Sequence, residues 1–195
     1  MIILGVDPGA SGAVAVLPVD SFWRVKAPAS AVKFANLTER QIADLFWKIY
    51  VDSNNAGDEV VAILELVHAM PAVKQWRDKD GQLQTKIMQG SVGTFKFGQS
   101  FGFLRGCLVT IGIPFEEARP QAWQKLLGCM TRGEKNVSKR KAQQLFPQLT
   151  ITHATADSLC LAEYGRRVKA GGPLFAGNPT NRNGAAMGDG PSITT

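Results

Sequence analysis

The chain has 195 residues, and its 22 lysines and arginines outnumber its 16 aspartates and glutamates, which gives a formal net charge of +6. This length suits one domain of about 150 to 170 residues with a tail, and it excludes a small scaffold that depends on disulfide bonds. The positive charge favours an anionic partner, but it does not choose between nucleic acid, acidic lipid and acidic protein.

The cysteines and the apolar runs are typical of a protein from a reducing compartment. Cys107, Cys129 and Cys160 are odd in number, widely spaced and without zinc-site spacing, which indicates reduced thiols in the core. No apolar run approaches the roughly 18 residues of a membrane span, and the first residues lack the basic segment and cleavage site of a secretory signal. We therefore expect a soluble, cytoplasmic protein without a membrane partner.

The N-terminal part predicts a hairpin followed by a helix. Residues 1–7 and 12–18 are rich in apolar and β-branched side chains, and a Pro-Gly-Ala-Ser break separates them. A third short strand is expected near residues 23–26. From Thr38 onward apolar residues recur with helical period, and Thr38 with Gln41 forms a candidate capping box.

The middle of the chain alternates between regular and irregular patterns. Residues 60–65 form an apolar run typical of a buried strand. Residues 68–95 are rich in Gln, Lys and Gly, which predicts a long mobile loop or an irregular insertion, and loops of this length are often functional. Over residues 98–112 apolar residues return at helical spacing, with three glycines four residues apart on one face. That face either packs on the sheet or forms a dimer interface.

The C-terminal part predicts one more strand, three helices and a tail. The strand is expected at 111–115, and the helices near 121–127, 138–146 and 154–169. After residue 170 the chain is Gly-, Pro-, Asn-, Ser- and Thr-rich, which is typical of disorder. We therefore expect an α/β domain over residues 1–169, with a mixed sheet flanked by α-helices, and a disordered tail over 170–195.

Three carboxylates stand at the ends of apolar elements. Asp7 ends the first strand, Glu65 ends the 60–65 strand, and Asp157 opens the last helical stretch. Like charges beside a core raise one another's pKa and resist desolvation unless a cation holds them together. If the two strands are neighbours, their ends bring Asp7 and Glu65 within reach of one ion. The pattern therefore predicts a metal site.

Basic residues gather in two places in the C-terminal part. The first group contains Arg132, Lys135, Lys139, Arg140 and Lys141 against Glu134 alone, and the second contains Arg166, Arg167 and Lys169. These residues are candidates for phosphate contacts, and the alternative is a solvated helix face.

Five motifs occur in an order that resembles a known family. They are Gly5-Val6-Asp7-Pro8-Gly9, Glu65-Leu66-Val67-His68-Ala69-Met70-Pro71, Gly98-Gln99-Ser100-Phe101-Gly102, Pro120-Gln121-Ala122-Trp123-Gln124 and Ala156-Asp157-Ser158-Leu159. Over residues 1–168 the set looks like a RuvC-type Holliday junction resolvase, especially its phage-associated branch. The resemblance implies an RNase H-like fold with a five-stranded mixed sheet, a homodimer, and Mg²⁺-dependent symmetrical nicking of four-way DNA, with Mn²⁺ able to substitute. It also implies a bacterial or phage-infected host cell.

The resemblance assigns roles to individual positions. Asp7, Glu65 and Asp157 match the metal-binding carboxylates. The family usually has a further acidic residue, or in some members a histidine, three or four positions before the last aspartate. Here position 154 is Ala and position 153 is His, so His153 is expected to be a fourth metal ligand or a general acid–base. The alternative is a solvent-facing residue at the start of the helix.

Other positions of the family concern DNA. His68 follows Glu65 where family members carry an aromatic residue that wedges into the junction, so His68 or the nearby Trp76 is a candidate for base stacking. Lys135 lies in a stretch similar to the family's phosphate-contacting lysine segment. Trp123 stands where some members have lysine, which favours packing over DNA contact at that position.

Two other functions fit part of the sequence. Asp-Pro-Gly after an apolar strand also resembles the phosphate loop of sugar and acetate kinases, but their duplicated architecture needs a second such loop, which this chain lacks. A junction-binding protein that kept the fold and lost cleavage is the remaining alternative, because Ala154 departs from the family pattern.

Overall fold

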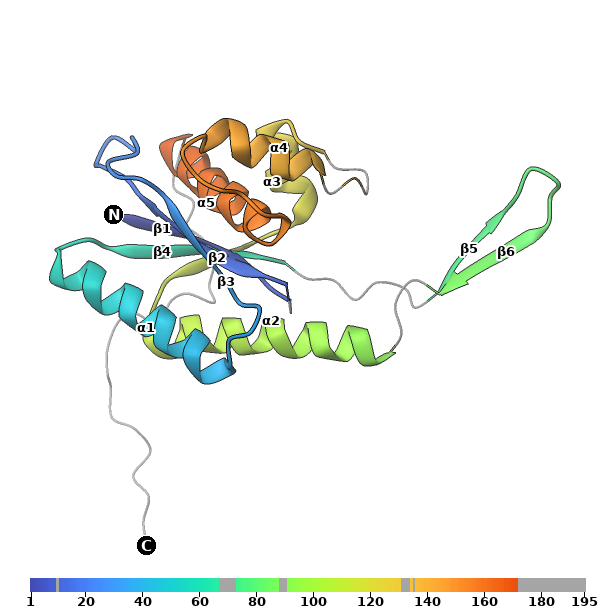
Figure 1. The fold of residues 1–195 in the computed structure, drawn as a ribbon, viewed down its shortest axis with the longest axis horizontal. Helices are drawn as coiled ribbons and strands as arrows, with labels where there is room; N and C mark the ends of the chain where they lie inside the picture. Colours follow the sequence, from blue (N-terminus) through green and yellow to red (C-terminus); the bar gives the residue numbers. More distant parts are fainter. Residues whose placement is uncertain (10, 67–72, 88–90, 131–133, 135, 172–195) are drawn as a thin grey trace, which may run out of the picture.

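The computed structural model describes residues 1–9, 11–66, 73–87, 91–130, 134 and 136–171 (Figure 1). In chain order the elements are β1 (Ile2–Asp7), β2 (Ala13–Pro18), β3 (Ser30–Lys33), α1 (Glu39–Asn55), β4 (Val60–Glu65), β5 (Val73–Arg77), β6 (Leu83–Ile87), α2 (Ser91–Ile111), β7 (Phe115–Ala118), α3 (Pro120–Leu127), α4 (Asn136–Leu145) and α5 (His153–Gly171). The expected tail lies outside the described residues from position 172 onward. Within the described part, no helix is long and apolar enough to span a membrane.

The central sheet is mixed and has the strand order β3-β2-β1-β4-β7. β1 and β2 form the predicted antiparallel hairpin, and β2 pairs antiparallel with β3. β4 runs parallel to β1 and to β7. The predicted five-stranded mixed sheet with flanking helices is therefore confirmed.

Helices cover both faces of this sheet. α3, α4 and α5 lie on one side, and α1 and α2 lie on the other (Figure 1). Successive residues of β1 contribute to different cores: Ile3 packs in the cluster under α5, and Leu4 packs in the cluster with α1 and α2. A strand that is buried on both faces reads as a continuous apolar run, which is what residues 2–6 show.

The start of α1 is set by the residues that were predicted to cap it. Thr38 accepts a hydrogen bond from the Gln41 backbone, and the Gln41 side chain accepts one from the Thr38 backbone, so the predicted capping box is present. The helices predicted near 121–127, 138–146 and 154–169 correspond to α3, α4 and α5.

The strand predicted at residues 23–26 was wrong. The side chain of Asp20 accepts hydrogen bonds from the backbone amides of Phe22 and Arg24, and Trp23 has a positive φ of 62°. Such a side-chain acceptor competes with strand pairing and closes a turn. Only a single bridge, Val19 to Val25, forms there, and the third strand begins later, at Ser30.

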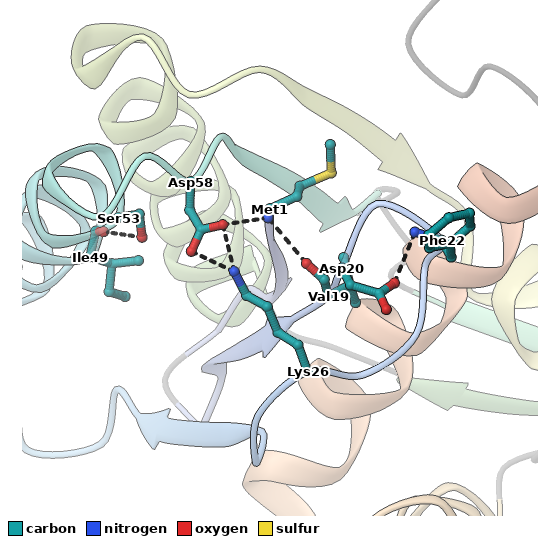
Figure 2. A network of polar contacts seen from close by, with 8 residues as sticks. All are labelled: Met1, Val19, Asp20, Phe22, Lys26, Ile49, Ser53 and Asp58. Atoms are coloured by element: carbon teal, nitrogen blue, oxygen red, sulfur yellow. Dashed lines mark hydrogen bonds and ion pairs between the residues drawn. The ribbon is translucent and has the colours of Figure 1, made fainter.

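The same end of the sheet carries a polar network (Figure 2). The carboxylate of Asp58 accepts from Lys26 Nζ at 2.6 and 2.7 Å and from the amino group of Met1 at 2.6 Å. The hydrogen bond from Lys26 is the main cause that holds the pKa of Asp58 below its usual value. The network ties the β2–β3 turn to the start of β4, at the opposite end of β1 from Asp7.

The middle of the chain differs from prediction in two places. Residues 73–87, expected to be part of an irregular loop, form the antiparallel β5–β6 hairpin, and α2 begins already at Ser91. The strand predicted at 111–115 starts only at Phe115, because α2 extends to Ile111 and is terminated by Gly112. Gly112 has a φ of 84°, a left-handed conformation that closes the helix and that glycine adopts without strain.

Candidate active site

The parallel pairing of β1 and β4 brings two of the predicted carboxylates together. Val6 is in register with Leu64, so Asp7 and Glu65 extend from the next positions of adjacent strands, as predicted for neighbouring strands. A hydrogen bond joins their side chains. Two carboxyl groups can share such a bond only when one of them holds a proton.

The third carboxylate reaches this pair because α5 lies unusually close to β1. A Cβ atom at Gly5 would collide with the carbonyl oxygen of Ser158 and the amide of Ala162. At Gly165 a Cβ would lie 2.6 Å from Ile63 Cγ1. Both glycines therefore permit the close packing that sets Asp157 beside the strand ends, where its charge acts on Glu65.

Glu65 has a strongly perturbed acidity. The pKa of Glu65 is raised from the usual 4.5 to about 7. Burial is the largest cause and the negative charge of Asp157 adds to it, while hydrogen bonds from Trp123 and Asp7 oppose the rise. The indole Nε1–H of Trp123 donates to Glu65 Oε1 at 2.9 Å. Glu65 therefore exchanges its proton near neutral pH, which is typical of functional carboxyl groups.

The carboxylates border an open cleft of about 720 Å³. It is lined by Asp7, Ser11, Lys33, Ala35, Gln124, Ser138, Thr152, His153, Ala154 and Asp157. Glu65 is not part of this lining and belongs to the site through its contact with Asp7. His153 is the first residue of α5, one helical turn before Asp157, and its side chain is exposed.

The donor set fits a hard divalent cation. Among the described residues, no group of three or more His, Cys, Asp and Glu side chains is already arranged around one point as metal ligands. Carboxylate oxygens are nevertheless the ligands that Mg²⁺ prefers. The buried carboxyl group of Glu65 beside Asp7, together with the nearby charge of Asp157, marks a place where a cation would relieve repulsion.

Some residues of the site were not predicted from sequence. Lys33 ends β3 opposite Ala13 and lines the cleft, but sequence patterns expected the third strand elsewhere. Ser100 of α2 accepts a hydrogen bond from the Gly9 amide at 3.0 Å and so holds the loop after Asp7. Trp123 is buried, as expected for packing, and its bond to Glu65 follows from the need of a buried indole N–H for an acceptor.

The predicted basic residues differ in their surroundings. Lys139 and Lys141 are half-buried on α4, whose Ser138 lines the cleft, and Arg140 lies 3.5 Å from Glu134. Arg166 and Arg167 bind the buried Glu163, and Arg166 also donates to the Trp23 carbonyl. These two arginines therefore have structural partners within the protein, and they lie about nine residues after Asp157 along α5. Arg132, Lys135 and His68 lie outside the described residues.

Solved structures of known proteins share the fold that carries this site. Neither a protein-family model nor a curated protein matches the sequence. Among solved structures, RuvC of Thermus thermophilus in complex with a Holliday junction substrate is similar, with a TM-score of 0.54 and 14% identity over 88% of this chain and 97% of that chain. The Thermus thermophilus RuvC structure gives a TM-score of 0.54 and 15% identity over the same shares. The mixed five-stranded sheet with its flanking helices is thus the RNase H-like fold of RuvC.

Proposed function

We propose that this chain is a metal-dependent endonuclease that resolves four-way DNA junctions by paired nicks, as its resemblance to phage-associated RuvC-type enzymes implies. The observation that supports this most is the convergence of Asp7, Glu65 and Asp157 beside an open cleft. The fold it shares with a RuvC bound to a Holliday junction substrate adds to that support. A cytoplasmic location in a bacterial or phage-infected cell belongs to the same proposal.

The site residues have distinct parts in this mechanism. Asp7, Glu65 and Asp157 would hold Mg²⁺ or Mn²⁺, with His153 as the fourth ligand. Bound Mg²⁺ supplies Lewis-acid stabilisation of the phosphate under attack. Trp123 donates a hydrogen bond to Glu65 Oε1 and so fixes the orientation of this carboxyl group. If His153 does not bind the metal, its exposed imidazole would act as the general acid–base at the side of the attacking water.

Phosphate contacts would supply most of the affinity for DNA. Lys33 lies in the cleft wall, and Lys139 and Lys141 belong to α4, whose Ser138 also lines the cleft. We assign the same role to Arg132, Lys135 and Arg140, and base stacking to His68 and Trp76. Affinity that rests on such contacts falls steeply as salt concentration rises.

A homodimer would set two such sites against the two strands to be cut. One face of α2 carries a stripe with the 3-4 spacing of a helix–helix seam: Val92, Phe95, Gln99, Gly102, Gly106 and Val109. Val92, Phe95 and Val109 are 59–68% exposed, and no atom of the described chain comes within 4 Å of a Cβ built at Gly102 or Gly106. The glycine face therefore does not pack on the sheet.

The stripe is complementary to itself. In an antiparallel pair about a twofold axis, Phe95 would face the partner's Gly106, and Val92 would face the partner's Val109. A large side chain opposite a glycine allows close packing. Beside Gly106, an apolar groove of about 500 Å³ lies between α1 and α2, lined in part by Trp47, Cys107 and Ile111. It offers room for the partner's Phe95.

One observation favours a second function. Ala154 lies in the cleft wall, three positions before Asp157, where the family has an acidic residue or a histidine. A protein that binds junctions without cutting them fits this observation.

Cleavage of a synthetic junction decides between the two functions. An end-labelled mobile four-way junction is incubated with the protein, with and without Mg²⁺, beside Asp7→Asn and the control Asp52→Asn, which changes an exposed carboxylate on α1. Symmetrical nicks that need Mg²⁺, persist in Asp52→Asn and vanish in Asp7→Asn are the expected result. Tight binding without cleavage would identify the binding protein, and wild-type cutting by Asp7→Asn would refute the assigned site.

A further inference from the structure

The turn that follows Asp7 is clamped by two side chains of α2. Gly9, two residues after Asp7, donates its backbone amide to Ser100 Oγ at 3.0 Å. A Cβ atom built at Gly9 would lie 3.2 Å from Phe97 Cε2, so the Phe97 ring also covers this backbone. Gly9 has a φ of 125°, which glycine adopts without strain and other residues rarely adopt. The clamp therefore acts on a defined backbone shape next to Asp7.

The turn has little room to deform between Gly9 and Asp7. The amide of Gly12 donates to the Gly9 carbonyl at 3.0 Å, and a Cβ atom at Gly12 would collide with the carbonyl oxygen of Asp7. Asp7 is itself in register with Ala13 of β2. Closely packed atoms transmit a displacement to their neighbours, so a shift of Gly9 also shifts Asp7.

The part of α2 that makes the clamp has little support from its own chain. None of the side chains of residues 92–103 is buried in the described structure, whereas Leu104, Cys107 and Leu108 further along the helix are buried. The N-terminal half of α2 extends past α1 (Figure 1). A helical segment of about ten residues is marginally stable in water without packing. This half of α2 is therefore expected to open locally unless another surface covers it.

The same segment carries the first residues of the α2 stripe. Val92 and Phe95 are 67% and 68% exposed, and helical spacing places them on the side of α2 away from Phe97. A second copy of the chain packed on the stripe would bury this side and stabilise the segment. The proposed dimer interface and the clamp on Gly9 thus share one short stretch of helix.

We propose that dimer formation and the position of Asp7 are coupled through the first half of α2, in which Phe97 and Ser100 act as positioning residues. This inference rests on the proposed function, because it links the proposed dimer to the proposed metal site. In the dimer, the partner stabilises the segment, and the turn after Asp7 is held. In the monomer, the segment opens more often, and Asp7 moves with the turn. The coupling is reciprocal, so a metal ion held by Asp7 would favour the dimer.

Hydrogen exchange of the Gly9 amide in a chelator tests the coupling without metal or DNA. Ser100→Ala removes the acceptor of this amide, and Phe95→Arg blocks the proposed interface from the other side of the helix. Phe22→Arg is the matched control, because it places the same charge at a similarly exposed aromatic residue outside the stripe. Dilution of the wild type gives a monomer without any substitution. Sedimentation velocity and thermal unfolding report the oligomeric state and the stability of each protein.

Exchange of the Gly9 amide should be about three- to ten-fold faster in Ser100→Ala, as the loss of one hydrogen bond implies. It should be at least about five-fold faster in Phe95→Arg and in the diluted wild type, and within two-fold of the wild-type dimer in Phe22→Arg. Unchanged exchange in monomeric Phe95→Arg and in the diluted wild type overturns the coupling. A wild type that stays monomeric at every concentration overturns it as well.

Mn²⁺ binding, measured by calorimetry, tests whether the clamp positions Asp7. Ser100→Ala is compared with Ser100→Thr, which keeps the hydroxyl acceptor, and with the control Ser53→Ala. Ser53 donates its hydroxyl to the Ile49 carbonyl at 2.7 Å, near Asp58 and away from the candidate site (Figure 2). The control variant therefore loses a hydroxyl hydrogen bond that has no connection with Asp7.

Ser100→Ala should bind Mn²⁺ about three- to ten-fold more weakly than the wild type, and Ser100→Thr and Ser53→Ala within two-fold of it. Wild-type affinity in Ser100→Ala overturns the positioning role. A wild type that binds no Mn²⁺ would refute the metal site of the proposed function, while exchange of the Gly9 amide would still decide the coupling. The two proposals therefore fail separately.

Discussion

At the scale of single residues, the most informative side chain is Glu65, whose carboxyl is held by Trp123 and Asp7 and repelled by Asp157. Its pKa of about 7 in the folded chain lies above the usual 4.5. The folded state therefore binds this proton more tightly than the unfolded state. The associated stability is fully present below pH 4.5 and is lost as the pH rises through 7.

Because stability depends on protonation of Glu65, we expect Glu65→Gln to stabilise the metal-free protein at alkaline pH. The amide still accepts a hydrogen bond from Trp123 but carries no charge. We expect Glu65→Gln to unfold with a free energy about 1–3 kcal/mol larger than the wild type at pH 8, and with no such gain at pH 4.5. Urea unfolding in a chelator at the two pH values measures the difference.

Glu163→Gln is a control variant that should change the free energy of unfolding in the opposite direction. Burial opposes ionisation of Glu163, but hydrogen bonds from Arg166 and Arg167 hold its pKa below the usual value. Loss of that charge should destabilise the protein at pH 8, because two arginines lose their partner. Equal stability of Glu65→Gln and wild type at both pH values would contradict the account of Glu65.

At the scale of elements, the site depends on the approach of α5 to β1. The contact is between backbones, with Gly5 facing Ser158 and Ala162. Backbone atoms of a long helix cannot move one at a time, so a single added methyl group displaces the helix as a unit. The position of Asp157 relative to Asp7 is thus set by a residue that has no side chain.

Gly5→Ala is therefore expected to weaken both stability and cleavage. The added Cβ should lower the free energy of unfolding by about 1–3 kcal/mol, as overpacking of a close contact does. It should also reduce Mg²⁺-dependent cleavage in the folded fraction, because α5 carries Asp157. Urea midpoints and single-turnover cleavage measure the two effects.

Gly98→Ala is the matched control, because a Cβ at this helical position has no neighbour within 4 Å in the described chain. Alanine is the better helix former, so Gly98→Ala should gain about 0.5–1 kcal/mol. A Gly5→Ala protein as stable as the wild type would show that α5 can shift freely, against the proposed packing.

At the scale of the whole molecule, the α2 stripe would extend the proposed site beyond one chain, because we propose that it meets a second copy of the protein. Exposed apolar residues that repeat along one helix face are unusual for a monomer and are typical of an interaction surface. The α2 stripe therefore predicts a dimer, and the oligomeric state can be measured directly.

Phe95→Arg is expected to convert a dimer into a monomer, because the charged side chain would have to lie against the partner's Gly106 and the apolar groove beside it. Sedimentation velocity should give twice 21.0 kDa for the wild type and a single chain for Phe95→Arg. Phe22→Arg changes an equally exposed aromatic residue outside the stripe and should stay dimeric. A monomeric wild-type protein would refute the stripe as an interface.

Much of the local structure follows from short-range patterns in the sequence. The apolar runs that end at Asp7 and Glu65 predicted two buried strands, the Thr38–Gln41 capping box predicted the start of α1, and helical periodicity predicted α3, α4 and α5. These features depend on residues within a few positions of one another, so they are visible in a linear pattern. The strand predicted from the same kind of pattern at residues 23–26 was wrong, because the Asp20 side chain binds two backbone amides and closes a turn there.

How the parts of the site meet depends on contacts that form only in the folded chain. The register of β1 with β4, the backbone contact at Gly5, the bond from Trp123 to Glu65 and the pKa of about 7 all join residues that are far apart in the chain. The β5–β6 hairpin likewise escaped prediction, because its strands lack the apolar alternation of a strand that packs on a core. Burial and long-range proximity arise only when the chain folds, and they set the chemistry of carboxylates that the sequence merely places at the ends of strands.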